Sequence, residues 1–164
     1  MIFNFTKHNT DLYITLLFLS RNLFFYNKLG LKDTFETRIY LMFLHFSIFL
    51  IIFKRKKIEF VQKDYDNFFN CVENNLRELG YGDIAVNKKM KTLNKIFYDI
   101  LLKINQSNND LKINKKLVLK YFFDLNLEND EKYGFFEQYF NDFYHFCFEL
   151  NHKSMIKDAS KFRF

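Results

Sequence analysis

The chain has 164 residues, a formal net charge of +6 and a hydrophobic share of 49%, and its charged residues are spread through every segment. This length favours one domain, and the mixture of charged and apolar residues excludes an intrinsically disordered chain. Because the chain has zero prolines, four glycines and long segments with apolar residues three to four apart, we predict an all-α, single-domain bundle of about six helices over residues 1–164.

The first two predicted helices run from about Thr10 to Leu29 and from Thr34 to about Phe53. Between them the order Leu-Gly-x-x-Asp predicts a sharp corner. We expect Gly30 to end the first helix in a left-handed conformation, and Asp33 to be the N-cap of the second. Glu36 would add the return half of a capping box.

The second predicted helix contains fifteen residues without a formal charge, from Ile39 to Phe53, followed by the basic cluster 54–57. A membrane span needs about 20 apolar residues, and this run is shorter and contains His45 and Ser47. We therefore expect a fully buried central helix. A membrane protein that spans at residues 39–53 stays open as an alternative, and so does attachment to a membrane surface through the basic cluster.

The next two predicted helices cover roughly residues 59–79 and 84–105, and a second Leu-Gly-x-x-Asp corner joins them. Gly80 fits the left-handed position just past a helix, and Tyr81 would then fold back onto Leu76. Asp83 is the expected N-cap of the helix that follows. With Gly80, Gly82 is expected to hold the two helices in a tight corner.

Less regular segments follow this helix pair. Residues 105–115 are polar and aperiodic, and they are predicted to form a loop. A helix is expected at about 115–127, a turn at 128–134 and a last helix at about 135–150, so that C-terminal helices occupy 110–151. The basic tail at 152–164 is expected to fray.

Motifs for catalysis or metal binding are missing from the sequence. No histidine lies at ligand spacing from a carboxylate or thiol, and neither cysteine belongs to a disulfide framework or a metal knuckle. We therefore predict no enzyme activity, no metal and no cofactor, and we read His45 as a core residue with one hydrogen bond. The residues considered were His8, His45, His145, His152, Cys71 and Cys147.

Lysines cluster at the start of two predicted helices. The first cluster contains Lys88, Lys89, Lys91 and Lys95, and the second contains Lys115, Lys116 and Lys120. A chain of net charge +6 can bind an anionic partner such as RNA or lipid headgroups. The alternative interpretation is a solvated basic face without a partner. A basic RNA-binding or ribosome-binding module therefore stays open as a second function, and DNA is not among the predicted partners.

Two ordered blocks of the sequence resemble the ubiquinol-cytochrome c chaperone family. The resemblance covers about residues 13–104, which form the family-like core. In the downstream block the matching residues are Asn75, Leu76, Arg77, Glu78, Leu79, Gly80, Gly82, Asp83, Ile84, Ala85, Val86, Lys88, Lys89, Phe97 and Tyr98. In the upstream block they are Phe25, Tyr26, Leu29, Gly30, Asp33, Thr34, Arg38, Leu44 and His45.

This resemblance implies a non-enzymatic assembly chaperone for ubiquinol-cytochrome c reductase, respiratory complex III, with newly made cytochrome b as its client. It also implies that a small partner subunit and the ribosome are contacts. The expected location is the bacterial cytoplasm, peripheral to the inner membrane, or the matrix side of that membrane for an organellar member.

The second corner is also the predicted partner-binding site. There the two glycines would place a set of charged side chains on one rim, and we expect this rim to contact a partner. The alternative is that Arg77 and Asp83 only cap and pair within the corner. The rim comprises Arg77, Asp83, Lys88, Lys89 and Lys91.

Overall fold

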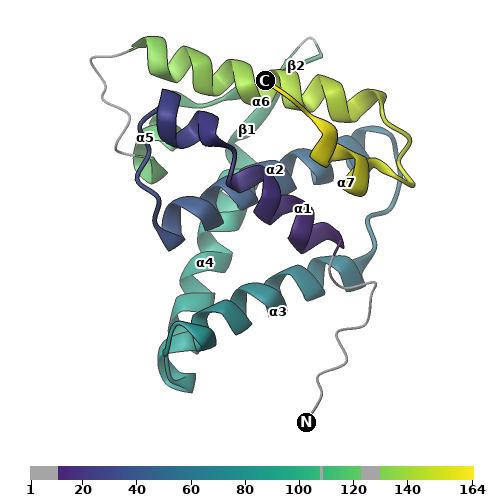
Figure 1. Cartoon of the computed structure of the whole chain (residues 1–164). Coiled ribbons are helices and arrows are strands. Elements are labelled where there is room, and N and C mark those ends of the chain that lie inside the picture. Colours follow the sequence, from purple (N-terminus) through teal and green to yellow (C-terminus); the bar gives the residue numbers. More distant parts are fainter. Residues whose placement is uncertain (1–10, 108, 123–129) are drawn as a thin grey trace.

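The computed structural model describes residues 11–107, 109–122 and 130–164, and it is a bundle of helices with one short hairpin (Figure 1). The all-α prediction is confirmed. The α-helices are α1 (Asp11–Ser20), α2 (Phe35–Arg55), α3 (Gln62–Glu78), α4 (Asp83–Lys103), α5 (Lys115–Tyr121), α6 (Asp130–Glu149) and α7 (Met155–Asp158). The other elements are a π-helical turn η1 (Phe24–Lys28), the strands β1 (Ile104–Ser107) and β2 (Asp110–Ile113), and a 3₁₀ turn η2 (Ala159–Lys161).

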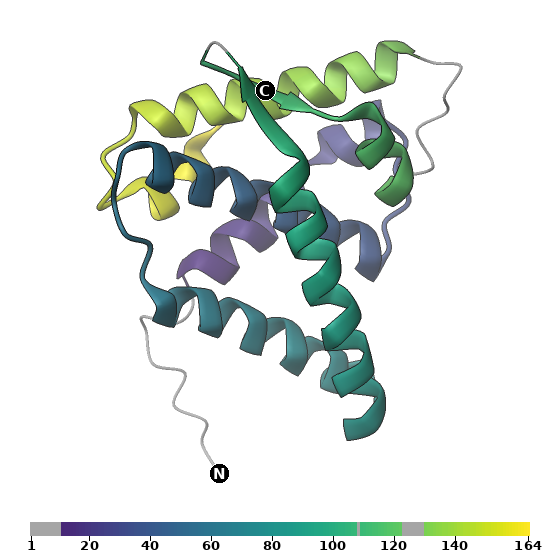
Figure 2. The same cartoon turned by 180° about the vertical axis from the view of Figure 1, so that it is seen from behind.

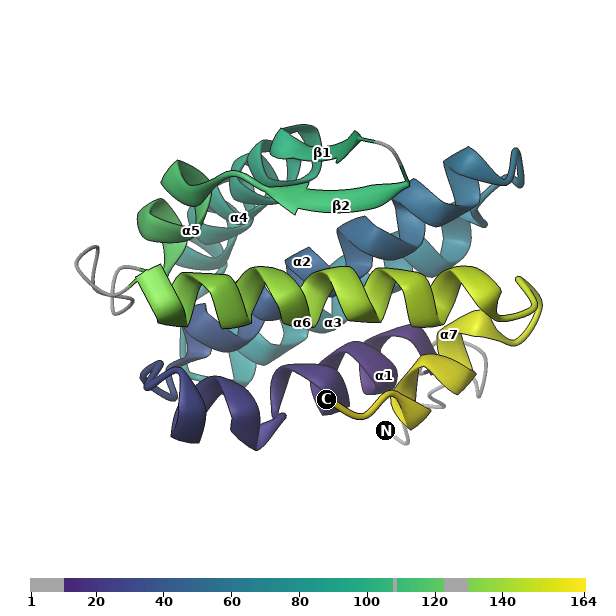
Figure 3. The ribbon, with the colours of Figure 1, turned by 90° about the horizontal axis from the view of Figure 1, so that it is seen from above.

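Helix α2 occupies the centre of the bundle. It packs against α1, α4 and α6 (Figure 3). Every side chain from 41 to 49 is buried. A helix that is apolar on all sides is stable in water only when other elements surround it. Within the described ranges α2 is the one helix long and apolar enough to cross a membrane. Of its most apolar stretch of 18 residues, 67% is buried inside the protein.

His45 is fully buried in the middle of α2 and makes two hydrogen bonds. Its Nδ1 lies 2.7 Å from the backbone oxygen of Leu41, and its Nε2 lies 3.0 Å from the hydroxyl of Tyr139 on α6. Because a carbonyl can only accept, Nδ1 carries the proton and Nε2 accepts from the hydroxyl. Burial lowers the pKa of His45 to about 3. It is thus the predicted core histidine, with one more hydrogen bond than expected.

Phenylalanine rings fill the space where α2, α3 and α4 meet. Phe97 of α4 lies 5.3 Å from Phe43 and 5.4 Å from Phe46, both on α2, measured between ring centroids. Its ring also lies 5.3 Å from that of Phe69 on α3. These separations are typical of edge-to-face and offset aromatic pairs. The rings therefore fix α3 and α4 against the central helix.

The first predicted helix is interrupted. Helix α1 ends at Ser20, and the π-helical turn η1 begins only at Phe24. The side-chain oxygen of Asn22 accepts a hydrogen bond of 3.0 Å from the amide of Phe24. Such local side-chain bonds compete with helical backbone bonds, so the break follows from Asn22. The prediction of one continuous helix to Leu29 is wrong.

The predicted loop at 105–115 is also wrong, because β1 and β2 pair there as an antiparallel hairpin with Ile104 opposite Ile113. Leu111 and Ile113 are buried, while Lys112 between them is exposed. The amide of Leu111 donates a 3.0 Å hydrogen bond to the side-chain oxygen of Asn141 on α6. The hairpin thus packs on α6. Polar and apolar residues alternate from Asp110 to Ile113, and this alternation in the sequence is the signal that could have predicted the strand.

The C-terminal region is more ordered than predicted. Helix α6 already begins at Asp130, so residues 130–134 are helical and the turn expected at 128–134 is wrong for them. Residues 128 and 129 lie outside the described residues. After α6, Met155, Ala159 and Phe162 are buried, so the tail packs where fraying was expected. The ring of Phe162 lies 5.3 Å from Tyr139, between centroids. Helix α5 ends at Tyr121 with Phe122 as its C-cap, so the prediction of a helix from 115 to about 127 is wrong at its end; residues 123–127 lie outside the described residues.

Protonation of His45 is expected to destabilise the fold at acidic pH. The unfolded chain binds this proton with an ordinary pKa near 6.5, whereas the folded pKa is about 3. Stability should therefore fall as the pH decreases from about 6.5 towards 3, and His45 should contribute roughly 1.5 to 2 kcal/mol of that loss between pH 6.5 and 5. Urea unfolding of the wild type and of His45→Gln at several pH values measures this difference.

The variant should show the flatter pH dependence, since the other titratable groups are shared. Equal slopes in both proteins would contradict the prediction. If His45→Gln does not fold, the ring signals of His45 in the wild type give the same answer by NMR. They should show a neutral imidazole at pH 5, and a protonated ring at that pH would contradict the assignment.

Candidate functional site

The corner between α3 and α4 is closed by the backbone around Gly80. This residue has a φ of 95°, in the left-handed region predicted for it. The amide of Gly80 bonds to the oxygen of Arg77 at 3.0 Å, and the amide of Tyr81 bonds to the oxygen of Leu76 at 3.3 Å. This pair of bonds is the Schellman motif, so the predicted stop and the return of Tyr81 to Leu76 are confirmed.

The start of α4 differs from the prediction. Gly82 is the N-cap, with a φ of −74° and a ψ of 167°, and Asp83 is the first helical residue. The prediction of Asp83 as the N-cap is wrong, because the extended conformation that a cap requires falls on Gly82. The carboxylate of Asp83 accepts instead from the guanidinium of Arg77. It still lies in the first turn, where a negative charge favours the helix.

Arg77 connects the two helices of the corner. Its guanidinium bonds to Asp83 on α4, and its Nη2 lies 3.0 Å from Oε1 of Glu73, one turn earlier on α3. The hydrogen bond to Asp83 and then that to Glu73 raise the pKa of Arg77. The structure therefore brings Arg77 and Asp83 together in an ion pair within the corner.

The three lysines of the rim have different surroundings. Lys88 and Lys91 are exposed, and neither forms an ion pair with another residue that the structure describes. The Nζ of Lys89 lies 4.5 Å from the centroid of the Tyr81 ring, a cation–π geometry. The ammonium groups of Lys88 and Lys91 are thus available to an anion outside the chain.

A cavity of about 380 Å³ opens beside these lysines, between the start of α2, the end of α3 and α4. Lys88, Lys89, Thr92 and Glu36 contribute polar groups to its wall. Its apolar wall consists of Phe35, Tyr40, Leu76, Leu93 and Ile96. The corner therefore combines positive charge with an accessible apolar surface.

Exposed apolar side chains flank the corner, and none of them was predicted to be a site residue. Leu79, Tyr81 and Ile84 are 59%, 40% and 84% exposed. Ile84 lies two positions before Val86, which is buried, and so falls on the opposite face of α4. This spacing was the signal in the sequence that could have revealed it.

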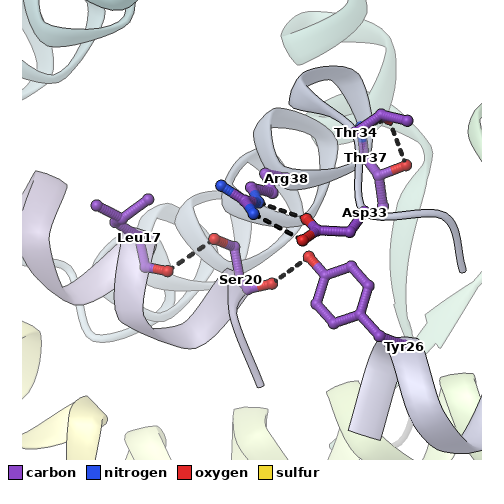
Figure 4. Close-up of polar contacts among 7 residues, drawn as sticks. All are labelled: Leu17, Ser20, Tyr26, Asp33, Thr34, Thr37 and Arg38. Carbon is purple, nitrogen blue, oxygen red and sulfur yellow. Dashed lines mark hydrogen bonds and ion pairs between the residues drawn. The ribbon is translucent and has the colours of Figure 1, made fainter. Parts of the chain in front are cut away.

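The first corner shares the glycine stop but has other capping contacts (Figure 4). Gly30 has a φ of 72°, as predicted. The N-cap of α2 is Thr34, whose Oγ1 accepts from the amide of Thr37 at 3.2 Å. The prediction of Asp33 as N-cap is therefore wrong. Because the cap is one residue later, Thr37 takes the third helical position that was predicted for Glu36, and the predicted capping box is wrong as well.

Asp33 pairs with Arg38 at this corner (Figure 4). The Nε and Nη2 of Arg38 donate to its two carboxylate oxygens at 2.6 Å and 2.7 Å. These bonds hold the pKa of Asp33 below its ordinary value. Nearby, the hydroxyl of Tyr26 donates to the backbone oxygen of Ser20 at 2.7 Å. Both corner aspartates therefore pair with an arginine.

The second lysine cluster is partly neutralised within the chain. The Nζ of Lys120 lies 2.9 Å from Asp99 on α4, and the same carboxylate accepts from Lys103 at 2.6 Å and from Tyr121. The hydrogen bond from Lys103 is the main cause that lowers the pKa of Asp99. Because of these contacts, Lys120 is less available to an external anion than Lys88 or Lys91.

Groups that could support catalysis are dispersed over the structure. Among the described residues no group of three histidines, cysteines or acidic residues could hold a metal ion. His145 pairs with Asp110 of the hairpin at 3.0 Å, and burial raises the pKa of the Cys147 thiol. Cys71 and Cys147 are both free thiols. His8 lies outside the described residues.

Comparison with known families gives one match. The model described as ubiquinol-cytochrome C chaperone matches residues 27–124, which is more than half of the chain. The match begins later than the resemblance noted in the sequence and extends further, through the hairpin and α5. No curated protein and no solved structure matches the chain.

Alanine at two glycines should change stability in opposite directions. At Gly80 an added Cβ meets nothing within 4 Å, but the φ of 95° strains any residue with a side chain. Gly80→Ala should therefore lower the free energy of unfolding by about 1 to 2 kcal/mol. Gly134 lies inside α6 and is equally open, so Gly134→Ala should raise that free energy by about 0.5 to 1 kcal/mol.

Urea unfolding followed by circular dichroism measures both effects. The two variants form a matched pair, because each adds one methyl group in open space. Equal stability of the Gly80→Ala variant and the wild type would contradict the left-handed conformation of the corner.

Proposed function

Because this chain belongs to the ubiquinol-cytochrome C chaperone family, we propose that it holds newly made cytochrome b while respiratory complex III is assembled. The family match is the observation that carries the proposal. Membership makes the chain a chaperone of complex III assembly, whose role is to bind a client protein. Such a role needs no catalytic group.

Exposed apolar side chains support the binding of an apolar client. Ile14 and Phe18 on α1 are 55% and 51% exposed, and Leu23 just after α1 is 68% exposed. Apolar patches on the surface of a protein often mark interaction sites. The transmembrane segments of cytochrome b are apolar, and they are exposed to water until they insert into the membrane. Transient contact with such patches would shield these segments from water.

The charged rim supports a contact with a protein or with another anion. We propose that Lys88, Lys89 and Lys91 bind a partner, because Lys88 and Lys91 have no ion pair with a described residue and Lys88 and Lys89 line the cavity. Arg77 and Asp83 would position that surface through their ion pair across the corner. A small partner subunit and the ribosome are candidate partners alongside the client.

A position beside the inner membrane fits the handling of a membrane protein. We propose peripheral association on the cytoplasmic side in a bacterium, or on the matrix side in an organelle. The burial of most α2 residues by α1, α4 and α6 favours peripheral association over a membrane span by that helix. Washing membranes with high salt or carbonate should release a peripheral protein, and resistance to both would favour a span at 39–53.

Binding to RNA or to the ribosome is the second candidate function. The unpaired lysines of α4 favour it, because phosphate groups bind such side chains without sequence preference. This function predicts an affinity that falls steeply with salt and is independent of cytochrome b.

Deletion of the gene should lower the amounts of assembled complex III and of cytochrome b, while other respiratory complexes stay near normal. The reason is that unprotected cytochrome b would aggregate or be degraded before assembly. Blue-native gels and haem spectra of membranes measure both quantities, and the restored wild-type gene is the control. Normal cytochrome b in the deletion strain would refute the proposed client.

Reversal of charge on the rim should weaken partner binding and leave the fold intact. Lys88→Glu with Lys89→Glu removes two positive charges beside the cavity, so recovery of partners by the tagged protein should fall. A change in unfolding free energy within about 0.5 kcal/mol is expected, as for most surface substitutions. Lys112→Glu with Lys153→Glu is a control with the same change of charge at two exposed lysines elsewhere. Equal recovery by both variants would remove the rim from the proposal.

A further inference from the structure

Helix α4 carries two regular stripes on opposite faces. The inward stripe consists of Val86, Met90, Leu93, Phe97 and Ile100, which pack in the core. The outward stripe consists of Ile84, Lys88, Lys91, Lys95, Tyr98 and Leu102, and all six side chains are exposed. Both stripes alternate steps of four and three residues. The offset of two residues between them corresponds to a rotation of about 200°.

The outward stripe lies on an uncovered side of the molecule, where α4 runs across the near face (Figure 2). Its apolar members are strongly exposed, with 84% for Ile84, 51% for Tyr98 and 77% for Leu102. The steps of four and three residues in this stripe are those that a helix uses to pack along a second helix. A continuous seam for another helix is therefore present.

Three lysines occupy the centre of this seam without compensating charges. Lys88, Lys91 and Lys95 have no ion pair with any described residue, whereas Lys103 on the same helix is bound to Asp99. Like charges three and four residues apart repel each other on a helix surface. A row of carboxylates placed along the seam would remove this repulsion.

We propose that the outward stripe of α4 docks an acidic amphipathic helix of a partner protein. Carboxylates in the middle of that helix pair with the three lysines, and apolar residues at its ends pack on Ile84 at one end and on Tyr98 and Leu102 at the other. The seam spans about 27 Å, which corresponds to about 18 residues of the partner helix. The proposal rests on the proposed function in that a chaperone acts by binding other proteins.

Other occupants fit this surface less well. A second copy of the chain would place lysines against lysines at the centre of the seam. A bilayer surface needs apolar side chains gathered together, whereas here the lysines separate Ile84 from Tyr98 by about 21 Å along the helix. An RNA strand would pair its phosphates with the lysines but would leave both apolar ends uncovered. Charge and apolar pattern together therefore favour an acidic helix.

Binding of designed peptides to the full chain tests the proposal. The probe is a fluorescein-labelled helical peptide of about 21 residues with leucines facing both ends of the seam and glutamates facing the lysines. The control peptide has glutamines in place of those glutamates. Fluorescence anisotropy should show binding at least about tenfold tighter for the glutamate peptide, as expected for several charge pairs at an interface.

Charge reversal of the seam provides the matched variant. Lys88→Glu with Lys91→Glu and Lys95→Glu should weaken binding of the glutamate peptide at least about tenfold and should favour a peptide with lysines at the same positions. Lys63→Glu with Lys112→Glu and Lys153→Glu changes the net charge equally at exposed lysines elsewhere, and it should stay within about twofold of the wild type. Unchanged circular dichroism would show that both variants fold.

Three results would overturn the proposal. The first is equal binding of the glutamate and glutamine peptides, and the second is equal loss of binding in the two triple variants. The third is that an RNA oligonucleotide or phosphatidylglycerol vesicles bind through the three lysines while the glutamate peptide does not. None of these results would affect the requirement for the gene in cytochrome b accumulation, so the proposed function is tested separately.

Discussion

Enclosure of helix α2 is the constraint on which the rest of the structure depends. Its apolar residues can be stable in water only if neighbours cover every side, and α1, α4 and α6 provide that cover. The His45–Tyr139 hydrogen bond makes the enclosure specific, because a buried imidazole without partners would be costly. This buried contact joins α6 to α2 within the aromatic core, and a hydrogen bond from Arg55 to the hydroxyl of Tyr144 joins the same two helices near the end of α2.

This enclosure determines what remains for function. Since α2 takes one face of α4 and the phenylalanine cluster fixes α3, the opposite face of α4 and the corner at Gly80 are left outside. A single helix therefore contributes both to the core and to the surface that we assign to binding. The ion pair of Arg77 and Asp83 joins the end of α3 to the start of α4 beside that surface.

The sequence predicted the parts of the fold that depend on local chemistry. The glycine stops at Gly30 and Gly80 follow from backbone conformation, and the helices from apolar spacing. Both aspartate caps were misplaced by one residue, because Asp33 and Asp83 bind arginines whose positions depend on the finished corner. The hairpin and the packed tail were missed because their apolar residues are few and their partners lie far away in the chain, on α6 for the hairpin and on α1 and α6 for the tail. Nor could the sequence separate paired from unpaired lysines, since Asp99 meets Lys120 only after folding.

The docked tail has a consequence for biosynthesis. Phe162 lies between the rings of Tyr139 and Phe143, and Phe164 packs on Phe24, which belongs to the N-terminal part of the chain. Phe162 is buried and Phe164 is about half exposed, so these two rings join the C-terminal segment to a core that the first helices begin. Because a nascent chain emerges from its N-terminus onwards, the ring of Phe162 can join this core only after α6 and the residues that follow it have been made. A chain interrupted before Phe162 would leave the rings of Tyr139 and Phe143 without this aromatic neighbour.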